Sequence, residues 1–104
     1  MSFAWEDLEA LVRERAAADP SESWTAKLVA SGVPGIAKKT GEEAVETVIA
    51  ALGDSDAALT AEAADLLYHL TVLLHARGVS VADVMTVLEA RQGRSGLAEK
   101  ASRL

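Results

Sequence analysis

The chain has 104 residues, of which 16 are Asp or Glu, 10 are Lys or Arg and none is Cys, and its formal net charge is −6. This length fits one domain spanning residues 1–104. The absence of cysteine excludes disulfides, thiolate catalysis and zinc sites built on Cys, and two histidines are too few for a mostly-His site. The acidic balance argues against nucleic-acid binding, which depends on Lys and Arg neutralising phosphates.

The chain shows no sign of a targeting or membrane segment. No uninterrupted apolar run approaches the roughly 20 residues of a spanning helix, and Met1 to Trp5 lacks the basic start of a signal peptide. We therefore expect no membrane contact and a cytoplasmic location. A domain of this size buries only about 60–70% of the surface of its unfolded chain, so a second copy would enlarge its core. We expect a homodimer.

Composition favours helices, because alanine is frequent and only 4% of the residues are aromatic. The expected fold is all-α, a small bundle of about four main helices. Asp19-Pro20 ends the first helix because proline cannot continue the hydrogen-bond ladder, and Gly32-Val33-Pro34-Gly35 is expected to form a loop. Gly78 is expected to close a third long helix, and Ser80 to cap a short one that follows. The expected helices are Trp5–Ala18, Trp24–Ala30, Ile36–Leu52, Ala57–Arg77 and Val79–Val87, before a C-terminal loop and weak helix over Gln92–Leu104.

The two longest predicted helices carry acidic motifs. The first contains Glu42-Glu43-x-x-Glu46 beside an apolar stripe of Val45, Val48, Ile49 and Leu52. At about 100° per residue, Glu42 and Glu46 flank this stripe and Glu43 lies farther out. The second helix carries Glu62-x-x-Asp65, and Glu62 lies one turn before the first residue of an inward stripe formed by Leu66, Leu70 and Leu73.

These carboxylates are expected to share one cleft. Glu62, Asp65 and His69 lie on one helix face, where they can meet the first motif on an antiparallel partner helix. Crowded carboxylates repel one another, and burying them unpaired is costly, so they need a cation. Mg²⁺ prefers oxygen ligands, which predicts a magnesium site. A solvated acidic face remains the alternative, and for His69 a hydrogen-bonded role at the edge of the core is favoured over catalysis.

The two acidic motifs together resemble the metal signature of the all-α nucleotide pyrophosphohydrolases with the MazG-like fold. More closely, nearly the whole chain is similar to the bacterial phosphoribosyl-ATP pyrophosphatases. The segments that carry this resemblance are Arg15 with Asp19-Pro20, Ser23 to Leu28, Lys38 to Ala44, Ala64 to His69, and Arg91 to Arg103. The acidic motif is specific only to the superfamily, whereas the Ser-Trp-Thr and Ser-Gly-Leu segments carry the narrower resemblance.

The resemblance implies Mg²⁺-dependent hydrolysis of 1-(5-phosphoribosyl)-ATP to 1-(5-phosphoribosyl)-AMP and pyrophosphate, the second step of histidine biosynthesis. A separate phosphoribosyl-AMP cyclohydrolase would be the functional neighbour. The implied metal-binding and catalytic residues are Glu42, Glu43, Glu46, Glu62 and Asp65. The implied substrate-binding residues are Arg15, Ser23, Trp24, Lys27 and Lys39, with Lys39 pairing a phosphate. Trp24 stands where the family commonly has Tyr, which preserves stacking but removes a phenolic hydroxyl.

Two other functions stay open. A housekeeping (d)NTP pyrophosphatase would share the carboxylates without needing the segments around Ser23 and Ser95. A non-catalytic helical interaction module would tolerate substitution of the acidic cluster and would show no Mg²⁺-linked stabilisation. The Ser23 segment also has a purely structural interpretation, in which Ser23 caps a helix and Trp24 anchors it in the core.

Overall fold

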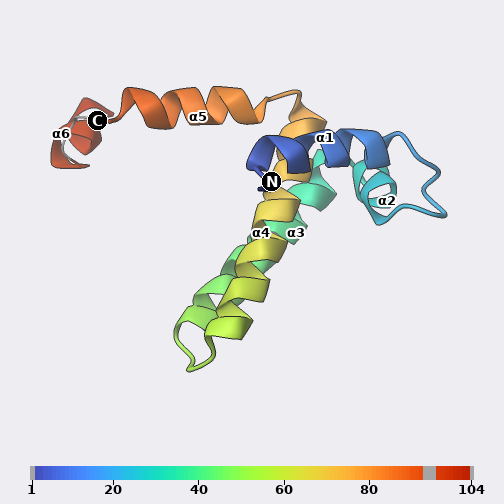
Figure 1. The fold of residues 1–104 in the computed structure, drawn as a ribbon, viewed down its shortest axis with the longest axis horizontal. Coiled ribbons are helices and arrows are strands. Elements are labelled where there is room, and N and C mark those ends of the chain that lie inside the picture. The colour runs from blue at the N-terminus through green and yellow to red at the C-terminus, as the bar shows by residue number, and fades with distance from the viewer. Residues whose placement is uncertain (1, 93–95, 104) are drawn as a thin grey trace.

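The computed structural model describes residues 2–92 and 96–103, which form six α-helices and no strand within those ranges (Figure 1). The helices are α1 (Trp5–Ala16), α2 (Trp24–Ala30), α3 (Gly32–Ala51), α4 (Asp56–Arg77), α5 (Val81–Ala90) and α6 (Gly96–Ser102). The all-α prediction is confirmed, with about five main helices rather than four. Residues 93–95, which fall in the predicted C-terminal loop, lie outside the described residues.

The predicted loop over Gly32–Gly35 is wrong, because these residues form the first turn of α3. Pro34 is tolerated there because the first N–H groups of a helix have no intrahelical acceptor. A Cβ on Gly35 would lie 2.6 Å from the Oγ of Ser31, so a larger residue at this position would force the Ser31 side chain to move. The break that the sequence suggested is therefore a helix start.

The other boundaries agree closely with expectation. α2 has the predicted bounds, whereas α1 ends two residues before Ala18. Gly78 closes α4 with a left-handed φ of 69°, and the side chain of Ser80 accepts a hydrogen bond from the backbone N–H of Asp83, as predicted. A tertiary contact also holds the start of α5, because Oε2 of Glu9 accepts a hydrogen bond of 2.8 Å from the N–H of Val81.

α3 and α4 form an antiparallel hairpin that extends away from α1 and α2, and α5 runs off in a different direction (Figure 1). The radius of gyration is 15.8 Å. A compact chain of this length has a radius of gyration of about 13 Å. The molecule is thus too extended to bury its apolar surface within one copy.

The buried core lies where α1 and α2 meet the base of the hairpin. It is built from Val12, Leu28, Ile36 and Val72, which are at most 6% exposed. Nε1 of Trp5 donates a hydrogen bond of 2.8 Å to Oγ1 of Thr71 and so ties α1 to α4. This core holds one end of the hairpin and leaves the rest of its length projecting.

The predicted core stripe of α3 is wrong within this chain. Val45, Val48, Ile49 and Leu52 are 59%, 60%, 64% and 84% exposed. α3 instead packs on α4 with its opposite face, on which Glu43 is buried. The periodicity correctly identified an apolar stripe. A helical projection does not show, however, whether that stripe packs within the same chain.

By length and composition alone, α4 is long and apolar enough to cross a membrane, although only 17% of its most apolar window is buried. The sequence analysis considered only uninterrupted apolar runs. It did not single out this segment because acidic residues lie among its apolar ones. Thr71 and His69 of α4 are buried against the rest of the chain. Burial of these polar side chains within the protein is the behaviour of a helix in a helical bundle.

Candidate active site

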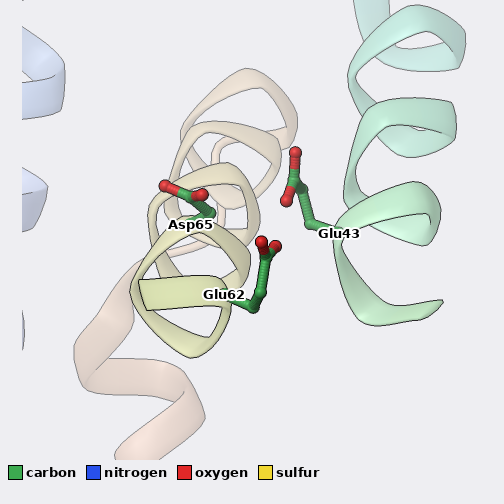
Figure 2. A group of neighbouring side chains, drawn as sticks. All are labelled: Glu43, Glu62 and Asp65. Carbon is green, nitrogen blue, oxygen red and sulfur yellow. The ribbon is translucent and has the colours of Figure 1, made fainter. Parts of the chain in front are cut away.

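Three carboxyl groups gather where α3 packs on α4. Glu43 comes from α3, Glu62 and Asp65 come from α4, and one oxygen of each lies within 4.8 Å of the others. Figure 2 shows Glu43 extending across toward α4, where Glu62 and Asp65 lie about one turn apart. An all-oxygen group of this kind matches the ligands that Mg²⁺ prefers.

The burial of this group makes it chemically demanding. Glu43 is only 6% exposed, and Oε2 of Glu43 and Oε2 of Glu62 are both buried without a hydrogen-bond partner. A buried carboxylate without a partner is strongly disfavoured, so it must gain a proton or a cation. Asp65 is exposed, which leaves the cluster open to solvent on one side.

The electrostatics point the same way. Burial raises the pKa of Glu43 and of Glu62 above the ordinary value of 4.5. A shared hydrogen bond with Glu46 and repulsion from its carboxylate raise both pKa values further, as does the charge of Asp65, whereas His69 lowers the pKa of Glu43. Glu46 therefore lies close to both buried carboxyl groups. A divalent cation would take the place of the protons that these groups otherwise hold.

The expected order of the three glutamates on α3 is wrong. Glu43, which the helical projection placed farthest from the core, is the buried one, while Glu42 and Glu46 are exposed. The error has one cause, because the projection was centred on Val45 and its apolar neighbours, which face away from α4. Glu42 does not belong to the group of three whose oxygens meet.

Lys39 stands at the rim of the cluster. Its Nζ lies 3.8 Å from Oε1 of Glu43, one turn along α3, and the lysine side chain is 40% exposed. A partly exposed ion pair of this length is weak, so the ammonium group is only loosely held by Glu43. Lys39 is the residue for which the family resemblance implied a phosphate contact.

The remaining predicted substrate residues lie on α1 and α2. Oγ of Ser23 accepts a hydrogen bond from the N–H of Ala26 and donates one to the backbone oxygen of Arg15, so the helix-cap interpretation of Ser23 is confirmed. Trp24 is 54% exposed, so the alternative interpretation of Trp24 as a core anchor is wrong and its ring is open to solvent. The side chains of Arg15 and Lys27 are exposed.

A hydrogen bond brings α2 beside the cluster. Oγ1 of Thr25 and the hydroxyl of Tyr68 are 2.6 Å apart, and Tyr68 is within one turn of Asp65 on α4. α2 thus packs on the part of the hairpin that carries the carboxylates.

A separate cavity of about 180 Å³ contains none of the predicted site residues; it is lined by Glu9, Arg13, His75, Gly78, Val79 and Ser80.

His69 is buried beside the site, and the sequence predicted the contact of only one of its two ring nitrogens. Its Nδ1 lies 2.7 Å from the backbone oxygen of Asp65, which confirms the predicted hydrogen-bonded role at the core edge. Its Nε2 is buried without a partner, which was not predicted. The available signal was its position seven residues after Glu62, which puts both side chains on the same face of α4.

Comparison with known proteins gives one consistent result. Residues 5–92 match the family described as phosphoribosyl-ATP pyrophosphohydrolase. The chain is similar to the phosphoribosyl-ATP pyrophosphatase of Agrobacterium fabrum, with 57% identity over 102 residues that cover 98% of this chain and 95% of that protein. It is 59% identical to the enzyme of Rhizobium rhizogenes, with 97% of each chain covered, and 58% identical to that of Cereibacter sphaeroides, with 94% and 95% covered. The matched residues include the whole acidic cluster, and the chain belongs to the phosphoribosyl-ATP pyrophosphohydrolase family.

Proposed function

We propose that Glu43, Glu62 and Asp65 hold Mg²⁺ for the hydrolysis of 1-(5-phosphoribosyl)-ATP to 1-(5-phosphoribosyl)-AMP and pyrophosphate. This reaction of histidine biosynthesis is the activity that family membership gives the chain. The observation that carries the metal assignment is the pair of buried carboxylate oxygens, one on Glu43 and one on Glu62, that have no hydrogen-bond partner. Glu46 and the exposed Glu42 complete the proposed set from the outer side of the cluster.

The residues around the carboxylates have complementary tasks. When bound, the ion offsets phosphate charge and lowers the pKa of a coordinated water. Lys39 pairs a phosphate at the rim, and Arg15 and Lys27 supply further positive charge for the triphosphate. Trp24 offers its exposed ring to the base of the substrate. The hydroxyl of Ser23 is engaged in capping α2, so its contribution is to hold the start of that helix in place.

We propose that the enzyme is a homodimer built through the hairpin of α3 and α4. The apolar stripe of α3, formed by Val45, Val48, Ile49 and Leu52, is exposed, and the molecule is extended for its length. A second copy is the occupant we assign, because two hairpins with an apolar outer side can pack by two-fold symmetry into a four-helix bundle. The stripe carries no charge, so the net charge of −6 does not oppose the contact locally.

The proposed compartment is the cytoplasm, with a separate phosphoribosyl-AMP cyclohydrolase consuming the product. The cysteine-free composition is compatible with a reducing compartment. No contact with nucleic acid or membrane is part of this proposal.

The test is pyrophosphate release from phosphoribosyl-ATP, measured beside ATP and a panel of dNTPs, with Mg²⁺ and with excess chelator. A strong preference for phosphoribosyl-ATP that disappears on chelation is the expected result. Preference for a dNTP would keep the metal site and replace the substrate with that of a housekeeping pyrophosphatase. Release from no substrate would favour the non-catalytic interaction module.

A further inference from the structure

Three buried side-chain atoms without hydrogen-bond partners come from one region of the molecule. Within residues 2–92 and 96–103, the buried polar side-chain atoms that have no partner are Oε2 of Glu43, Oε2 of Glu62 and Nε2 of His69. All three residues belong to the packed pair α3 and α4. Buried polar atoms without partners are rare in folded proteins, so each of the three calls for an explanation.

The hydrogen bond on the other side of the His69 ring determines what Nε2 can do. Nδ1 lies 2.7 Å from the backbone oxygen of Asp65, and a carbonyl oxygen can only accept a hydrogen bond. Nδ1 therefore carries the hydrogen, and in the neutral imidazole the lone pair is on Nε2. The edge of the ring also packs against Tyr68, with centroids 5.0 Å apart and planes at 86°. The ring is thus held in place with an acceptor at its buried end.

The ring lies on the face of α4 that carries the carboxylates. His69 follows Asp65 by one turn and Glu62 by two turns, which places the three side chains on one face of α4. A lone pair and two carboxylate oxygens all accept hydrogen bonds, so none of them can satisfy another when the acids are ionised. With the acids ionised, as they are when they hold a cation, a donor is missing, and water is the donor that a polar site open on one side admits.

We propose that His69 is a positioning residue of the metal centre, whose Nδ1–H anchors the backbone of Asp65 while its Nε2 accepts a hydrogen bond from water within the carboxylate cluster. This inference rests on the metal site proposed above. Hydrogen-bond partners behind metal ligands fix the orientation of those ligands, and losing one costs about 10–100-fold in metal affinity or activity. His69 acts through Asp65, whose backbone oxygen lies 2.7 Å from Nδ1, and does not itself touch the ion.

Two substitutions distinguish the role of Nδ1 from the role of Nε2. His69→Asn keeps an amide donor near the position of Nδ1 but provides no acceptor at the position of Nε2. His69→Gln reaches farther and places an amide oxygen near the Nε2 position. The matched control is His75→Asn, because His75 is also on α4 but lines the separate cavity beside Glu9.

The experiment has a metal-binding arm and a spectroscopic arm. Mg²⁺ affinity is measured by calorimetry for the wild type and the three variants, after circular dichroism has shown that the helical content is unchanged. We expect His69→Asn to weaken Mg²⁺ binding by about 10–100-fold, His69→Gln to recover most of this loss, and His75→Asn to match the wild type. In the metal-free wild type, ¹⁵N NMR of the neutral imidazole is expected to show the hydrogen of His69 on Nδ1.

The outcomes are distinguishable. A hydrogen on Nε2 in the NMR spectrum overturns the inference even where a substituted chain fails to fold. Wild-type Mg²⁺ affinity in a folded His69→Asn variant rejects the role of His69 while leaving the metal site intact. Failure of the wild type itself to bind Mg²⁺ removes the proposed metal site, and the role of His69 falls with it.

Discussion

α3 buries a polar face and exposes an apolar face, which is the reverse of the usual arrangement. The face packed on α4 carries Thr40, Glu43 and Thr47, whereas the exposed face carries a stripe of four large apolar residues from Val45 to Leu52. Proteins usually bury apolar side chains and expose charged ones. Each face of this helix therefore lacks a partner in the isolated chain. The inward face lacks a cation, and the outward face lacks an apolar protein surface.

The two faces of α3 differ in how narrowly they define the partner that they lack. The hydroxyls of Thr40 and Thr47 donate hydrogen bonds of 2.8 Å to backbone oxygens one turn earlier, so they need nothing further. On the inward side of α3, Oε2 of Glu43 is the buried side-chain atom without a hydrogen-bond partner, while Oε1 lies 3.8 Å from Nζ of Lys39. That free oxygen calls for a cation or a proton. The outward stripe requires only a complementary apolar surface. The inward face thus specifies chemistry and the outward face specifies assembly.

Replacing Glu62 with Gln attacks the inward face and should have the largest effect. The substitution removes a ligand charge while preserving shape, so Mg²⁺-dependent hydrolysis should fall by more than about 100-fold, since losing an outer hydrogen-bond partner alone costs about 10–100-fold. The measurement is kcat/KM for phosphoribosyl-ATP, with the helical spectrum as a check on folding. The control is Glu89→Gln on the exposed part of α5. A Glu62→Gln enzyme with normal turnover would remove this residue from the metal site.

Replacing Val48 with Asp attacks the outward face. A charge in the centre of the apolar stripe would be buried without a partner in a dimer, so we expect the mass in solution to fall from two chains to one. Light scattering coupled to size-exclusion chromatography measures this directly. Phe3→Asp is the control, because it places the same charge on a 69% exposed apolar residue outside the hairpin. A wild-type chain that is monomeric at high concentration contradicts the assembly.

The pH dependence of stability tests the inward face without any substrate. The pKa values of Glu43 and Glu62 are raised in the folded state above the unfolded value near 4.5, so the folded protein holds more protons between the two values. Their contribution to stability is therefore fully present below the unfolded pKa and is lost as the pH rises through the folded pKa. In chelator, the melting temperature should decline above pH 4.5 less steeply for Glu43→Gln than for the wild type. Equal slopes would show that Glu43 is not desolvated in solution.

Local rules in the sequence were sufficient for several helix ends but not for the start of α3. Ser80 capping α5 and Gly78 ending α4 depend on backbone groups within a few residues, and each was predicted from short-range chemistry. The start of α3 was misjudged because Gly32 and Pro34 are common in loops, yet the first turn of a helix also tolerates them.

The three residues whose carboxyl groups meet, Glu43, Glu62 and Asp65, were among those predicted, but the face of α3 that carries Glu43 was not. The spacing of the acidic motifs placed them on facing helices, the crowding of the carboxylates predicted Mg²⁺, and the resemblance to a pyrophosphohydrolase family supplied the reaction. The choice between Glu42 and Glu43 as the buried residue depends on which face of α3 meets α4, and the apolar stripe at Val45 pointed the wrong way. Because the apolar stripe of α3 is exposed in the single chain, the hydrophobic pattern did not report the contact between α3 and α4.

The finest test of the two faces exchanges a hydroxyl for a methyl group at adjacent positions. Thr47→Val removes a hydroxyl from the inward face, and Val48→Thr adds one to the outward face, with almost no change in side-chain volume. The hydroxyl of Thr47 serves only the backbone oxygen of Glu43, so its loss should cost about 1 kcal/mol of stability or less and leave dimerisation unchanged. Val48→Thr buries a hydroxyl in the proposed dimer, which should cost about 1–3 kcal/mol of association.

Sedimentation over a dilution series measures both dimer dissociation constants, and thermal unfolding at one concentration gives the stabilities. Because the two residues are neighbours on one helix, differences in helix propensity and volume nearly cancel, and what remains is the environment of each face. The expected pattern is therefore a weaker dimer for Val48→Thr alone. If Thr47→Val weakened the dimer equally, the inward face of α3 would itself lie in the contact between chains, and the carboxylate cluster would be enclosed by the second copy instead of being open at Asp65.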